Sequence, residues 1–112
     1  MSSALFTPLK VGSVTVPNRI GMSALARSRS SATVPNDIMK EHYDQRAAGG
    51  AGLIVTEAIL IGTEWPDAPG IWNNGQVAGW KKIVGSVHAL GSKIYAQLWH
   101  GTSLCEESST GC

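Results

Sequence analysis

The sequence predicts an α/β fold built around a parallel sheet. A hairpin pattern comes first, and after it strand-like and helix-like segments alternate in the order β, α, β, α, β. The strand-like segments are almost wholly apolar, which is typical of parallel strands whose two faces are covered by other layers. Both long loops follow a strand and precede a helix, so they are expected at the edge where the strands have their carboxyl ends.

An antiparallel hairpin is predicted near the N-terminus. Residues 9–11 and 14–16 alternate apolar and polar side chains around Gly12-Ser13, and a glycine in the first turn position suits a type II′ turn. Residues 19–24 then predict a short strand, with apolar side chains at Ile20 and Met22.

A first helix is predicted after a polar loop at residues 25–34. Asn36 suits the N-cap, because its side chain can accept a backbone N–H of the first turn, and Gly49-Gly50 suits the C-terminal end. Apolar residues recur at helical spacing: Met39, Tyr43 and Ala47 fall on one face, which is expected to be buried, with Ile38 beside them.

A second strand is predicted over residues 52–56, with Glu57-Ala58 at its carboxyl end and a long loop over residues 59–75. Asn74-Gly75 would suit a hairpin turn, but no alternating strands flank it, so we interpret it as the start of a second helix, which ends at Leu90-Gly91. The expected buried face of this helix consists of Val77, Trp80, Ile83, Val84 and Val87.

Residues 93–99 predict the third parallel strand, with both of its faces buried. Gln97 interrupts the apolar run of this strand. A buried carboxamide without partners would cost a few kcal/mol, so Gln97 is expected to meet a polar group.

Three strand ends are expected to converge at one edge of the sheet, namely residues 23–26, 56–58 and 97–99. Small apolar residues at the first two ends would let a flat ring approach, and Gln97 could hydrogen-bond in the plane of that ring. The alternative is plain barrel packing, with Gln97 bonded to a neighbouring backbone.

Composition argues against several classes of function. The formal net charge is +1, with 9 Lys and Arg against 8 Asp and Glu, so no nucleic-acid partner is expected. The N-terminus lacks the basic and apolar regions of a signal peptide, and no apolar run approaches the length of a membrane span. With only two cysteines, both near the C-terminus, a cytoplasmic protein with reduced thiols is expected.

Residues that could bind metal or catalyse reactions are few. His42, His88 and His100 show no arrangement with other residues that is typical of acid–base catalysis, so each is interpreted as structural and no catalytic residue is assigned. His100, Cys105 and Cys112 do not have the spacing of a common zinc site, so no metal is expected, and a Cys105–Cys112 disulfide is not expected either.

The glycine-rich stretch at residues 49–52 is not interpreted as a nucleotide loop. It precedes a strand, whereas a phosphate-binding loop follows one. A small flavodoxin-like domain is a weaker alternative for the whole chain, because no phosphate loop is evident after the first strand.

Several motifs, in order and at matching spacing, resemble the old yellow enzyme family of FMN-dependent NAD(P)H oxidoreductases, or ene-reductases. The resemblance extends from Leu5 to Gly101. The motifs are LFTPLKVG (5–12), NRI (18–20), SALARSR (23–29), YDQRA (43–47), TEA (56–58) and QLWHG (97–101).

The resemblance implies a partial (β/α)8 TIM barrel. Residues 1–101 would supply the hairpin that closes the bottom of the barrel and the first three strands, and residues 102–112 would be an unrelated, disordered tail. A complete barrel needs about 250 residues. The family's substrate-binding pair, its proton-donating tyrosine and its FMN-phosphate site would all lie beyond this chain.

The resemblance also implies roles for individual residues. Those expected to contact or approach the flavin ring are Ser23, Ala24, Leu25, Ala26, Ala58 and Gln97, and Trp99 is expected close to the substrate pocket. Gln97 corresponds to the glutamine that bonds the pyrimidine edge of the flavin. Ala26 departs from the Thr or Cys of many members, and Ala24 replaces a common proline.

The function implied by the resemblance is FMN-dependent reduction of an activated alkene, such as a small-molecule enone, with NADPH or NADH as the hydride donor. The isolated chain is expected to be inactive, because it would end before the catalytic residues. The alternative is a non-catalytic remnant that binds flavin weakly or not at all and self-associates through open sheet edges.

Overall fold

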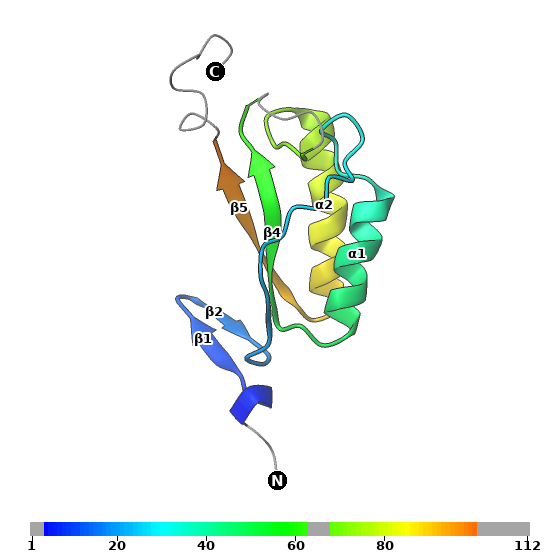
Figure 1. Ribbon diagram of the computed structural model, residues 1–112. Coiled ribbons are helices and arrows are strands. Elements are labelled where there is room, and N and C mark those ends of the chain that lie inside the picture. The colour runs from blue at the N-terminus through cyan, green and yellow to red at the C-terminus, as the bar shows by residue number, and fades with distance from the viewer. Residues whose placement is uncertain (1–3, 63–67, 101–112) are drawn as a thin grey trace.

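The computed structural model describes residues 4–62 and 68–100, so the predicted tail at residues 102–112, with both cysteines, lies outside the described residues. The structure confirms an α/β fold with a parallel three-stranded sheet in the order β3-β4-β5. A separate hairpin precedes the sheet (Figure 1). The elements are η1 (Ala4–Phe6), β1 (Leu9–Val11), β2 (Val14–Val16), β3 (Gly21–Met22), α1 (Asp37–Ala48), β4 (Leu53–Leu60), α2 (Asn74–Ala89) and β5 (Lys93–Trp99).

The hairpin forms as predicted and lies at the end of the sheet where the strands begin (Figure 1). Gly12 has a φ of +61°, whereas Ser13 is not in the positive-φ region, which is the combination that a type II′ turn requires. Asn18, just after the hairpin, donates through Nδ2 to the carbonyl of Gly50 at 2.8 Å. This bond ties the N-terminal segment to the turn that leads into β4.

Two strand boundaries differ from the predictions. The strand predicted at residues 19–24 is reduced to Gly21–Met22, because its ladder stops just before a bulge that disrupts β4. β4 in turn extends to Leu60, since its last residues pair with β5 through Leu60 and Trp99. The loop after β4 is therefore shorter than residues 59–75.

Helix α1 begins as predicted, with the side chain of Asn36 accepting the N–H of Met39 at 3.0 Å. Met39, Tyr43 and Ala47 are buried. Ile38, expected beside this face, is 62% exposed, because it lies one residue round the helix from Met39 and points away from the sheet.

Helix α2 begins one residue after the N-cap Asn73, whose side chain forms a capping box with Gln76. Gln76 is fully buried, and it occupies the core-facing position that had been predicted for Val77. Val77 is instead 46% exposed, so this part of the prediction was wrong. The carboxamide of Gln76 is satisfied, because it accepts from Trp72 and Asn73 and donates to Thr33.

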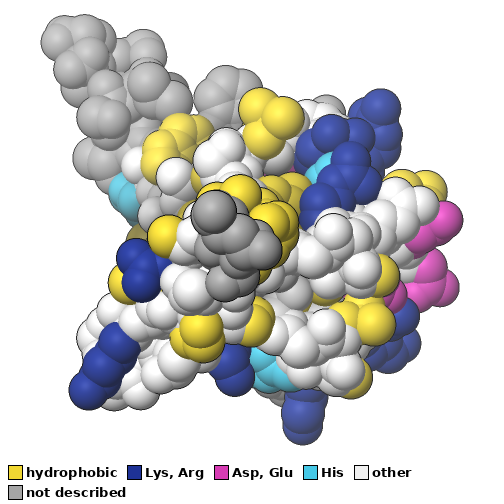
Figure 2. Space-filling model, turned by 90° about the horizontal axis from the view of Figure 1, so that it is seen from below, with side chains coloured by type: hydrophobic (Ala, Val, Ile, Leu, Met, Phe, Trp, Pro, Cys, Tyr) yellow, Lys and Arg dark blue, Asp and Glu magenta, His cyan; other side chains and the backbone are white. Residues whose placement is uncertain are grey.

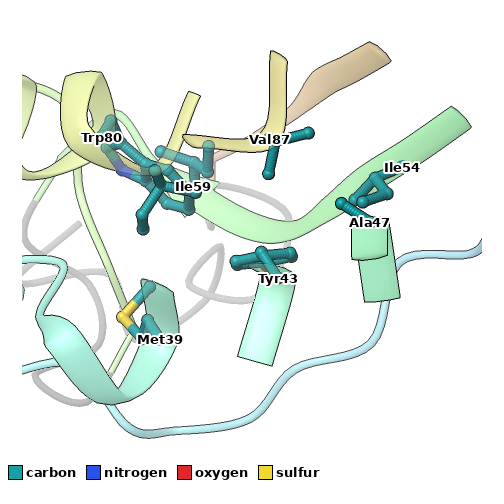
Figure 3. Close-up of a cluster of buried hydrophobic side chains, with 8 residues drawn as sticks. Met39, Tyr43, Ala47, Ile54, Ile59, Trp80 and Val87 are labelled. Atoms are coloured by element: carbon teal, nitrogen blue, oxygen red, sulfur yellow. The ribbon is translucent and has the colours of Figure 1, made fainter. Parts of the chain in front are cut away.

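The hydrophobic core lies between the two helices and one face of the sheet. Figure 3 shows side chains of α1 and α2 pointing toward those of β4. The indole N–H of Trp80 is satisfied by the carbonyl of Gly70 at 3.1 Å. The buried cluster consists of Met39, Tyr43, Ala47, Ile54, Ile59, Trp80, Ile83 and Val87.

The prediction that both faces of β5 are buried was wrong. Tyr95 is 39% exposed and Leu98 is 61% exposed, and Gln97 is exposed as well. The helices cover only one face of the sheet, and β5 is an edge strand (Figure 1). Within the described residues, the other face at the carboxyl ends of β4 and β5 carries no covering helix.

Figure 2 shows Lys and Arg side chains at several places on the face in view, with one group of them gathered beside a histidine. The formal net charge of the whole chain is only +1. Neither helix in the described ranges is long and apolar enough to cross a membrane.

Candidate functional site at the carboxyl ends of the strands

Two of the residues predicted for the site are direct neighbours in the sheet. Ala58 of β4 pairs with Gln97 of β5, and Leu60 pairs with Trp99 one step further on. Ile94 of β5 packs against the core on the helix side, so by alternation along the strand Gln97 and Trp99 lie on the face that the helices leave uncovered. Ala58 and Trp99 are half-buried, whereas Gln97 is exposed.

The pairing of Ala58 with Gln97 depends on a β-bulge. Val55 pairs with Tyr95 and Ala58 with Gln97, so Thr56 and Glu57 together oppose only Ala96. The hydroxyl of Thr56 accepts the backbone N–H of Gln97 at 3.1 Å and donates to the carbonyl of Glu57 at 2.8 Å. The backbone N–H of Gln97 therefore keeps a hydrogen-bond acceptor, the Thr56 hydroxyl, at the point where the bulge interrupts the regular ladder.

The same bulge turns Glu57 into the layer between the sheet and α1. Its side chain is only 2% exposed. The hydroxyl of Tyr43 donates to Oε1 of Glu57 at 2.9 Å and accepts the backbone N–H of Glu57 at 3.0 Å. Tyr43 therefore satisfies both a buried side chain and a buried backbone group of the bulge.

Burial dominates the titration of this pair. Desolvation raises the pKa of Glu57 above its usual value, and the Tyr43 hydroxyl together with the backbone and charge of Arg27 partly offsets that rise. Desolvation also raises the pKa of Tyr43 well above its usual value. Tyr43 is therefore a neutral hydrogen-bond donor near neutral pH.

Residues 23–26 lie on the other side of β4 from β5, since β4 is the central strand. None of Ser23, Ala24, Leu25 and Ala26 is buried, and Leu25 is 64% exposed. Arg27, the next residue, lines a small cavity of about 60 Å³ together with Glu57. Residues 23–26, which are predicted to face the flavin, are therefore followed directly by a residue that shares a cavity with Glu57.

His42 lines the same cavity from α1. Its Nε2 is buried and has no hydrogen-bond partner among residues 4–62 and 68–100. Burial, reinforced by the charges of Arg46 and Arg27, lowers the pKa of His42. His88 and His100 are exposed and lie at other places, at the end of α2 and after β5, so the described structure does not bring the three histidines together.

No group of three His, Cys, Asp or Glu side chains in the described part of the chain could hold a metal ion. Sequence reasoning did not foresee the contact between Glu57 and Tyr43. A signal was present, because Glu57 is the only charged residue in the run LIVTEAIL, and a charge inside a buried strand calls for a partner.

Comparison with known proteins identifies the class to which this arrangement belongs. The model of the NADH:flavin oxidoreductase / NADH oxidase family matches residues 4–110. The chain belongs to this family, and the relatives and solved structures that it resembles include old yellow enzymes. The resemblance found in the motifs is thereby confirmed.

Three relatives illustrate the match. The chain is 48% identical over 99 residues to chanoclavine-I aldehyde reductase fgaOx3 of Penicillium roqueforti, covering 85% of this chain and 27% of that protein. It is 47% identical to the old yellow enzyme homologue of Zymomonas mobilis, with a TM-score of 0.80, covering 88% of this chain and 28% of the other. It is 46% identical to morphinone reductase in complex with tetrahydroNAD, with a TM-score of 0.81 and the same coverages of 88% and 28%.

The chain therefore spans little more than a quarter of the length of these relatives. The similarity supports the general fold prediction, because the matched structures cover most of this chain at high TM-score.

Proposed function

We propose that this chain forms part of the flavin-ring site of an FMN-dependent NAD(P)H oxidoreductase that reduces activated alkenes such as enones. The observation that carries the proposal is the pairing of Ala58 with Gln97 on the uncovered face, at the carboxyl edge of a parallel sheet. That edge is where α/β barrels hold their ligands. Family membership and the nicotinamide ligand of the related morphinone reductase support the choice of cofactors.

The residues present fit a flat aromatic ring. Ala58 has a small side chain, so the ring can lie against β4 at this point. The carboxamide of the exposed Gln97 offers two donors and an acceptor, which suits the alternating donor and acceptor groups of a pyrimidine edge. Ser23, Ala24, Leu25 and Ala26 would line the ring from the other side of β4, and Trp99 would lie toward the substrate.

When bound, FMN would supply the redox chemistry, taking hydride from NADPH or NADH and passing it to the β-carbon of the alkene. The contribution of this chain is to hold and orient the ring and to exclude water from it. We assign no catalytic proton transfer to its residues, because the resemblance places the proton donor beyond the first three strands of the barrel.

The second candidate is a non-catalytic remnant that self-associates. It is favoured by the exposed apolar side chains of Tyr95 and Leu98 on β5, because β5 is an edge strand of the described sheet and an edge strand can pair with another chain. In this case the chain would bind little flavin.

The test is to purify the chain at several concentrations, add FMN and follow flavin absorbance through a sizing column. Flavin eluting with a discrete folded species supports the proposal. Colourless or concentration-dependent oligomeric protein supports the remnant. With either result, we expect no NADPH-dependent reduction of an enone by this chain alone, and turnover above a flavin-only control would contradict that expectation.

A further inference from the structure

We propose that Glu57 is a positioning residue, which sets the place of Ala58 and Gln97 from behind the sheet. The inference rests on the proposed flavin site, because it concerns residues that would face the ring. Glu57 itself lies on the opposite side of the sheet, in contact with α1, so it would not touch the flavin. Its effect would pass through the backbone of the bulge.

The first step of the argument is geometric. A strand without the bulge would place Glu57, and not Ala58, two residues beyond Val55 on the uncovered face. In the observed register, the extra residue turns Glu57 toward α1 and brings Ala58 opposite Gln97. In the observed register the methyl group of Ala58 lies on the uncovered face and the carboxylate of Glu57 is buried. The regular register would place the carboxylate on the uncovered face instead.

The second step concerns what holds the bulge in place. The Tyr43 hydroxyl bonds to both the side chain and the backbone N–H of Glu57. Thr56 then connects the carbonyl of Glu57 to the N–H of Gln97. A continuous series of hydrogen bonds therefore runs from helix α1 through Glu57 to the backbone of Gln97.

The third step concerns the other side of β4. Arg27, which follows the segment predicted to line the ring, shares a small cavity with Glu57. The Glu57 carboxylate lies close enough to Arg27 for the backbone and the charge of Arg27 to act on it. Glu57 is thereby linked to both parts of the proposed ring site, residues 23–26 and the Ala58–Gln97 pair.

The experiment compares the chain with its Glu57→Ala and Glu57→Gln variants, using backbone amide hydrogen exchange measured by NMR without FMN. In Glu57→Ala, we expect the Gln97 amide to exchange at least tenfold faster relative to core amides such as that of Ile83. Glu57→Gln keeps an acceptor for Tyr43 and should restore most of the protection. Glu41→Ala, on the exposed face of α1, is the matched control and should leave the Gln97 amide unchanged.

Unchanged relative protection of Gln97 in Glu57→Ala would overturn the proposal. So would a loss of protection that is equal at Gln97 and in the core, since that pattern indicates a purely structural role. If Glu57→Ala does not fold, Tyr43→Phe replaces it, because this change removes the hydroxyl that holds Glu57. The same relative increase at Gln97 is then expected, and its absence overturns the proposal.

FMN titration of the same variants separates this inference from the proposed function. We expect Glu57→Ala to weaken FMN binding by about tenfold and Glu41→Ala to leave it unchanged. Failure of the unsubstituted chain to bind FMN would contradict the proposed function of the chain, while the exchange experiment would still decide whether Glu57 positions Gln97. FMN binding that is normal in a folded Glu57→Ala variant would contradict the inference alone.

Discussion

The hydroxyl of Tyr43 donates to Oε1 of Glu57 at 2.9 Å and also accepts the backbone N–H of Glu57 at 3.0 Å. One side chain of helix α1 therefore satisfies two buried groups of the β4 bulge. Because the bulge determines which β4 residue lies opposite Gln97, this contact between helix and sheet bears on the proposed flavin site as well as on stability.

Replacing Tyr43 with Phe should lower the free energy of unfolding by about 1–3 kcal/mol, because it leaves a buried carboxylate and a buried N–H without their partner. Chemical denaturation followed by circular dichroism measures the change. Tyr95→Phe is the matched control, since Tyr95 is 39% exposed, and it should change stability by less than about 0.5 kcal/mol. Equal effects of the two substitutions would show that the Tyr43 hydroxyl is not required.

The raised pKa of Glu57 predicts a particular dependence of stability on pH. The folded state holds the proton of Glu57 to a higher pH than the unfolded chain, in which the pKa of glutamate is about 4.3. Between these two pKa values the folded state binds more protons, so the contribution of Glu57 to stability falls as pH rises through this window and is constant above it.

Glu57→Gln removes this titration. The free energy of unfolding of Glu57→Gln minus that of the unsubstituted chain should therefore rise with pH from about pH 4 and level off above the folded-state pKa. Urea unfolding of both proteins from pH 4 to pH 8 measures this difference. A difference that falls with pH would mean that the partners of Glu57 stabilise its charge by more than burial destabilises it.

Two glycines of helix α2 should respond in opposite ways to the same substitution. A Cβ at Gly85 would meet no atom within 4 Å, whereas a Cβ at Gly79 would lie 2.8 Å from the carbonyl oxygen of Pro35. Gly85→Ala should stabilise the protein by about 0.5–1 kcal/mol through helix propensity. Gly79→Ala should destabilise it by about 1–3 kcal/mol, because the backbone at Pro35 must move. Thermal unfolding of both variants tests the close approach, and a stabilised Gly79→Ala would contradict it.

Gln97→Ala tests the proposed bond to the flavin. The loss of one hydrogen bond of about 0.5–1.5 kcal/mol should raise the dissociation constant for FMN by about two- to tenfold. Gln45→Ala is the control, because Gln45 is exposed on α1 and interacts with Glu41 and Arg46. Flavin fluorescence titration gives both constants. An unchanged constant in Gln97→Ala would remove Gln97 from the site.

Local sequence determined where most elements begin and end. The hairpin, the cap at Asn36, the glycines after α1 and the bounds of β5 all agree with the prediction. Each of these depends on residues within a few positions of one another, such as a side chain that accepts from the next turn or a glycine at positive φ. The family motifs are likewise short, and they were sufficient to identify the family.

Only the tertiary structure decided how the site is assembled. Tyr43 and Glu57 are 14 residues apart, and Thr56 and Gln97 are 41 apart, so no local pattern could show that they meet. At the Thr56-Glu57 bulge, β4 is bonded to Tyr43 of α1 through Glu57 and continues its pairing with β5 from Ala58 onward. The exposure of β5 was missed for the same reason. An apolar strand encodes a tendency toward burial, but burial depends on which layers the chain places against each face.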